Sequence, residues 1–114
     1  MRFWLITVLG LFIFPALAQT FLPGTEDIPL MKGLTQVEET ASFDNPAERM
    51  VLIEAQTKLP PKKISQFYKE TLTNLGWTEK KANTFERGND SFSIEIISSE
   101  KTSQIQFRLS QRNP

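Results

Sequence analysis

Cysteine and histidine are both absent from the 114 residues of this chain. Without cysteine the protein can form no disulfide, and thiol nucleophiles and iron–sulfur clusters are also excluded. Without histidine a Ser-His-Asp triad cannot form, and the usual zinc sites lose their common ligands. The five glycines are scattered, and none opens a helix after a strand as a phosphate-binding loop requires. We therefore expect no catalytic residues, no metal ligands and no cofactor.

An excess of charge is also lacking. The chain has 13 lysines and arginines against 13 aspartates and glutamates, and the two signs are interspersed. Such a balance gives no electrostatic attraction for nucleic acid or for an anionic membrane surface. We expect neither of these as a partner.

Only one long apolar run occurs, at residues 3–14, directly after the positively charged Arg2. Pro15 ends the run, and Ala16-Leu17-Ala18 places small residues where a signal peptidase cleaves. An uncleaved membrane anchor is the alternative, but about twelve apolar residues fall short of the roughly twenty that span a bilayer. We predict a secretory signal peptide at 1–18, cleaved after Ala18, and a periplasmic or secreted protein without a transmembrane span.

The mature chain, residues 19–114, divides into two parts by pattern. Residues 19–36 show little periodicity and are interrupted by Pro23-Gly24, Pro29 and Gly33, which predicts an extended lead-in segment. Its apolar side chains can hold it against the domain surface. The remainder, residues 37–114, is predicted to be a single domain.

The most regular pattern lies between Pro60-Pro61 and Gly76. Prolines are well tolerated in the first turn of a helix, and glycine is the usual residue just beyond a helix end. Trp77 is placed to pack back on the last turn. An apolar stripe with steps of three and four predicts the buried face of this helix, with Tyr68 at its edge; its members are Ile64, Phe67, Tyr68, Leu72 and Leu75.

Period-two alternation marks the strands. It is clearest in the final one, where Ile105, Phe107 and Leu109 alternate with polar residues. One-sided alternation indicates an antiparallel sheet with one covered face. We predict an α+β fold, in the order β-β-α-β-β-β-β, with one helix on one face of a twisted, mainly antiparallel sheet. The strands are expected at 39–43, 49–57, 77–81, 84–87, 91–98 and 104–110.

These features favour a non-enzymatic domain that binds another envelope protein or peptide, by strand addition at a sheet edge. The residues that we expect to contribute to binding are Asp44, Arg49, Tyr68 and Arg108. Turn capping and surface ion pairing are the structural alternatives for the charged residues.

Two other functions stay open. One is a small-ligand binder for a lipid or peptidoglycan fragment, with a pocket between helix and sheet; its lining would be Phe67, Tyr68, Trp77 and Phe107. The other is a hydrolase that uses the paired carboxylates of Glu54 and Glu95.

Several segments, in their order and spacing, resemble a family of small, functionally uncharacterised secreted proteins of alphaproteobacteria. These segments are IPLMKGL (28–34), FDNPAERMV (43–51), FYKETLTNLGW (67–77), FER (85–87) and IQFRLS (105–110). The resemblance implies an envelope location and a shared fold, without an activity. Glu48 stands where that family tends to have glycine before the arginine.

Overall fold

The computed structural model describes residues 20–113, so the predicted signal peptide lies outside the described residues. Seven elements follow one another along the chain: β1 (Leu34–Asp44), β2 (Glu48–Thr57), α2 (Pro61–Asn74), β3 (Thr78–Lys81), β4 (Thr84–Arg87), β5 (Asp90–Ser98) and β6 (Ser103–Arg112).

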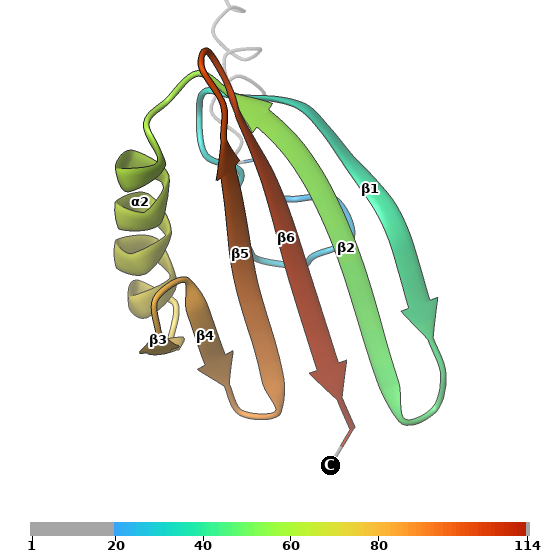
Figure 1. The fold of residues 1–114 in the computed structure, drawn as a ribbon. Coiled ribbons are helices and arrows are strands. Elements are labelled where there is room, and N and C mark those ends of the chain that lie inside the picture. Colours follow the sequence, from blue (N-terminus) through green and yellow to red (C-terminus); the bar gives the residue numbers. More distant parts are fainter. Residues whose placement is uncertain (1–19, 114) are drawn as a thin grey trace, which may run out of the picture.

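All six strands form a single antiparallel sheet in the order β1-β2-β6-β5-β4-β3 (Figure 1). The last strand, β6, therefore lies in the middle, between β2 and β5. Helix α2 stands beside the β3–β4–β5 side of the sheet, as Figure 1 shows. The predicted α+β fold with one helix on a sheet is confirmed.

Alternation along the strands separates a buried inner face from an outer face. In β6 the odd positions from Ser103 to Leu109 are buried, and the even positions between them are exposed or half-buried. The same period holds in β2 and β5. Across these strands the inner face forms one core with the apolar stripe of α2.

Helix α2 ends with the arrangement that Gly76 and Trp77 predict. Gly76 adopts a φ of 95°, in the left-handed region that favours glycine. Its N–H donates to the Thr73 carbonyl at 3.1 Å, and the Trp77 N–H donates to the Leu72 carbonyl at 2.9 Å. These two bonds define a Schellman motif, which turns the chain directly into β3 and buries the Trp77 ring in the core.

Residues 20–33, which belong to the predicted lead-in segment, contribute side chains to the core of the domain. Phe21 pairs with Pro29 to form a small loop, which passes behind the sheet in Figure 1. Leu22 and Ile28 from this loop are both only 1 % exposed and belong to the core. The loop and α2 therefore cover the inner face together.

Two other details differ from the sequence-based expectation. The first strand runs over 11 residues and begins at Leu34, well before the predicted start at residue 39. Leu75 was expected on the buried stripe but is 37 % exposed. It is the C-cap residue, where the backbone has left the helical conformation, so its side chain no longer follows the stripe.

No helix within residues 20–113 is long and apolar enough to cross a membrane.

Candidate functional site

The four residues expected to bind a partner do not meet at one place. Asp44 is exposed at the end of β1, and Arg108 is exposed on the outer face of β6. Arg49 is half-buried, and Tyr68 is fully buried under the opposite face. The structure thus distributes them over both faces of the sheet.

Tyr68 was expected at the edge of the helical stripe. It lies instead at the centre of the stripe, with 0 % exposure. Its hydroxyl donates to the Pro29 carbonyl at 2.9 Å and accepts from the Met31 N–H at 3.3 Å. Both partners are backbone groups of the loop at residues 20–33. Tyr68 therefore joins the helix to this loop, and its hydroxyl is satisfied within the chain.

Burial raises the pKa of Tyr68 well above its ordinary value near 10, although the Met31 N–H lowers it in part. The unfolded chain releases this proton above about pH 10 while the folded chain keeps it. Above this pH we expect the free energy of unfolding of the natural chain to fall by up to about 1.4 kcal/mol per pH unit more than that of Tyr68→Phe.

Urea unfolding of both proteins between about pH 9 and 11.5 measures this difference, and the variant corrects for every effect of pH that does not involve the Tyr68 hydroxyl. Tyr68 is the only tyrosine in the chain, so ultraviolet absorbance follows its ionisation directly. Stability curves that stay parallel above pH 10 would show that the hydroxyl ionises freely in the folded state.

The guanidinium of Arg49 forms hydrogen bonds within the fold. Its Nη1 donates to Gln111 Oε1 at 2.7 Å, and its Nη2 donates to the Gly24 carbonyl at 2.6 Å. It thereby connects β2 to β6 and to the loop at residues 20–33. The register places Asp44 opposite Arg49, but no ion pair joins the two side chains.

Arg87 is a structural residue that the sequence did not reveal. It binds both carboxylate oxygens of Asp27, at 3.0 and 3.3 Å, and its Nη1 also donates to the Leu75 carbonyl at 3.1 Å. Its guanidinium carbon lies 4.5 Å from the centre of the Trp77 ring, within range of a cation–π interaction. Arg87 therefore holds the helix end and the loop together, and no local pattern relates residue 27 to residue 87.

The aromatic residues expected to line a ligand pocket pack against one another. The ring centres of Tyr68 and Phe107 are 5.4 Å apart, and those of Phe67 and Tyr68 are 4.9 Å apart. Trp77 lies 6.1 Å from Phe92, which stacks on Phe107 at 5.8 Å. These distances are typical of packed aromatic pairs, so the rings fill the space between helix and sheet.

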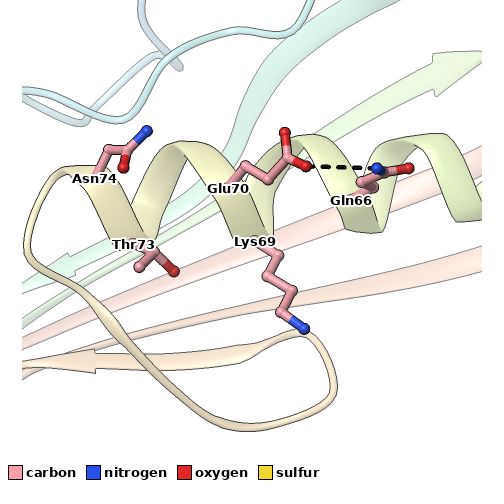
Figure 2. Close-up of a pocket in the computed structure, with 5 residues that line it drawn as sticks. All are labelled: Gln66, Lys69, Glu70, Thr73 and Asn74. Carbon is pink, nitrogen blue, oxygen red and sulfur yellow. Dashed lines mark hydrogen bonds between the residues drawn. The ribbon is translucent and has the colours of Figure 1, made fainter.

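The polar side of α2 borders a shallow hollow of about 570 Å³ (Figure 2). The described residues that line it all come from this helix: Gln66, Lys69, Glu70, Thr73 and Asn74. Gln66 donates to Glu70 at 3.4 Å, and Lys69 pairs with Glu79 of β3 at 3.7 Å. These side chains interact with one another and with the neighbouring strand, and among residues 20–113 no groups from different elements converge on a common point.

The outer face of the sheet carries the most exposed aromatic side chain of the described residues. Phe43, with 54 % exposure, lies opposite Met50, and Ala41 lies opposite Leu52. These four residues form two adjacent rows on β1 and β2, which we call the outer apolar patch. No helix or loop of residues 20–113 covers them.

A row of carboxylates crosses the same face beside the patch. Glu38 is opposite Glu54, and Gln106 lies between Glu54 and Glu95. The structure thus places the predicted pair, Glu54 and Glu95, on one face but two strands apart, on an open surface. Arg108 lies beside Leu52 and forms no ion pair within the described part of the chain. A pair of carboxylates on such an open surface lacks the enclosing walls of a catalytic cleft.

Strand β1 forms one edge of the sheet, since it pairs with β2 alone among the described residues. Figure 1 shows its outer side free along its length. The pairing has register shifts between Thr35 and Glu38 and between Glu39 and Ala41, while residues 41–44 pair regularly. The N–H and C=O groups of alternate residues on such an edge point to solvent.

Comparison with known protein families, with curated proteins and with solved structures finds no match for this chain.

Proposed function

We propose that the protein is a non-enzymatic binding domain of the bacterial cell envelope, which receives a protein partner at the β1 edge and the outer apolar patch. One observation carries the proposal: an 11-residue edge strand with a free side lies next to an uncovered apolar surface. Exposed edges and contiguous apolar patches are the features by which sheets recruit partners.

The remaining surfaces support this choice by comparison. The core side of the sheet is filled by packed side chains, and the described residues that line the hollow beside α2 come from that one element. The opposite edge, β3, has only four residues and two consecutive lysines, Lys80 and Lys81. Short, lysine-bearing edges resist strand addition, so β1 is the better docking edge.

A photo-crosslinking residue tests the proposal in cells. Placed at Phe43, it is expected to capture a partner of defined mass. Placed at Thr73, which is exposed on the outer side of α2, it is expected to capture none. Equal labelling at the two positions, or monomer alone at both, would contradict the proposal.

The envelope location rests on the signal-like segment at residues 1–18 and is tested separately. We expect the protein purified from the periplasmic fraction of its host to begin at Gln19 by intact mass. A full-length protein recovered from the cytoplasm would contradict this part of the proposal.

A further inference from the structure

We infer that the partner of the β1 edge is an extended, basic segment of another protein, in which lysine or arginine residues flank a short apolar stretch. This inference rests on the proposed function and names the chemistry of the segment that adds to the sheet. Its starting point is the charge of β1 and its neighbour.

Strands β1 and β2 with their turn, residues 34–57, carry five acidic side chains and one basic side chain. The basic one, Arg49, is engaged with Gln111 and with the Gly24 carbonyl. On β1 itself Glu38, Glu39 and Asp44 are exposed, and none of them forms an ion pair with another described residue. The free edge is therefore uniformly negative.

This charge disfavours a second copy of the chain as the occupant of the edge. Two β1 strands side by side would bring six carboxylates together, and like charges on neighbouring strands are destabilising. Among the described residues, the basic edge of the sheet is β3, with Lys80 and Lys81. A contact between β1 of one copy and β3 of another would be head-to-tail, so it would not form a symmetric dimer. Strand β3 also provides only four residues for such a contact.

A strand added to β1 would alternate its side chains between the two faces, whereas β1 itself has one extra residue, Thr40, at the register shift between Glu39 and Ala41. On the outer face its side chains would lie beside an aromatic residue, a small residue and a carboxylate: Phe43, Ala41 and Glu38. On the other face they would lie beside two carboxylates and a hydroxyl: Asp44, Glu39 and Ser42.

A complementary segment follows from these neighbours. It needs basic residues opposite Asp44, Glu39 and Glu38, and apolar residues opposite Phe43 and Ala41. Read antiparallel to residues 38–44 of β1, the hexapeptide KVTIKK meets these requirements, with its threonine opposite Ser42 and no residue opposite Thr40, the extra residue at the register shift. Its backbone would supply the hydrogen bonds and its side chains the selectivity, which is the usual division in strand addition.

The experiment uses residues 19–114 and three end-capped peptides at low salt. KVTIKK is the probe and EVTIEE is its charge-reversed form. KVTIKK with every internal amide N-methylated keeps the charge, but these backbone amides can no longer donate hydrogen bonds. We expect the probe to bind at least about tenfold more tightly than either of the other two peptides. EVTIEE loses the three exposed charge pairs, and the N-methylated peptide loses the backbone hydrogen bonds that its amides would donate.

Charge reversal on the protein provides the second arm. In Glu38→Lys, Glu39→Lys, Asp44→Lys the preference should invert, so that EVTIEE binds more tightly than KVTIKK. The control Glu70→Lys, Glu86→Lys, Glu100→Lys makes the same net change at exposed positions elsewhere, and should keep the original preference. Thermal unfolding of both variants shows whether they remain folded.

Several results would overturn the inference. These are equal binding of KVTIKK and EVTIEE, equal binding of the N-methylated peptide, no binding by any peptide, or self-association of the chain through β1 in sedimentation. If crosslinking at Phe43 persists in cells despite one of these results, the proposed docking site stands and only the basic partner is wrong. If the Phe43 crosslink is absent as well, the proposed function also fails.

Discussion

A chain that begins at Leu34 is expected to be largely unfolded, whereas residues 19–114 should unfold in one cooperative transition. The deletion removes Leu22 and Ile28, both 1 % exposed. Complete burial of two such side chains contributes roughly 3–6 kcal/mol. Domains of this size are stable by only about 5–15 kcal/mol in total.

Polar contacts are lost in the same deletion. The Tyr68 hydroxyl loses the Pro29 carbonyl, Arg49 loses the Gly24 carbonyl, and Arg87 loses Asp27. A buried hydroxyl without a partner costs about 1–3 kcal/mol more. Circular dichroism and urea unfolding of the two chains measure the effect. A shortened chain with native signal and a melting temperature within a few degrees of the longer one would show that residues 20–33 are dispensable.

Phe107→Ala is expected to lower the free energy of unfolding by about 3–5 kcal/mol. Phe107 is fully buried in the central strand, stacked on Phe92 and in edge contact with Tyr68. Its removal leaves a cavity that the surrounding rings can fill only in part.

Phe43→Ala is the matched control, because the same substitution is made on the exposed outer face. We expect it to change the free energy of unfolding by less than about 0.5 kcal/mol. Denaturant unfolding of both variants gives the comparison. If Phe107 lined a ligand cavity instead of filling the core, its truncation would lower the free energy of unfolding far less. A difference below about 1 kcal/mol between the two variants would therefore support a ligand pocket between helix and sheet.

The helix and the later strands could be predicted because their signals are local. Gly76 and Trp77 form the Schellman motif within one turn of the stripe that ends there. In β6 every second residue from Ser103 to Leu109 is buried. Neighbouring residues alone determine these features, and the sequence displays them.

Strand β1 could not be delimited in this way. Its two register shifts break the alternation, and Gln36 adopts a φ of 50°, which is unusual for a residue other than glycine. A bulge moves later side chains to the other face, so the apolar and polar residues of β1 follow no simple period. The contribution of Leu22 and Ile28 to the core depends likewise on contacts with distant strands.

The candidate site shows the same division. That Arg108 would be exposed follows from the alternation of β6, but the burial of Tyr68 depends on the Pro29 and Met31 backbone, 39 and 37 residues away. In the sequence Arg49 and Arg87 resemble surface cations. Their structural role depends on contacts with the Gly24 carbonyl and with Asp27, respectively. The outer apolar patch could not be predicted either, because it depends on the pairing of Phe43 with Met50. That pairing is set by the length of the turn between β1 and β2 together with the bulges in β1.

Hydrogen exchange at the amides of β1 tests the docking account most directly. In residues 19–114 alone, the N–H groups of residues 41–44 that point away from β2 should exchange rapidly. On addition of KVTIKK they should become protected while the exposed side of α2 stays unchanged. Protection confined to α2, or exchange in β1 that the peptide leaves unaltered, would contradict the account.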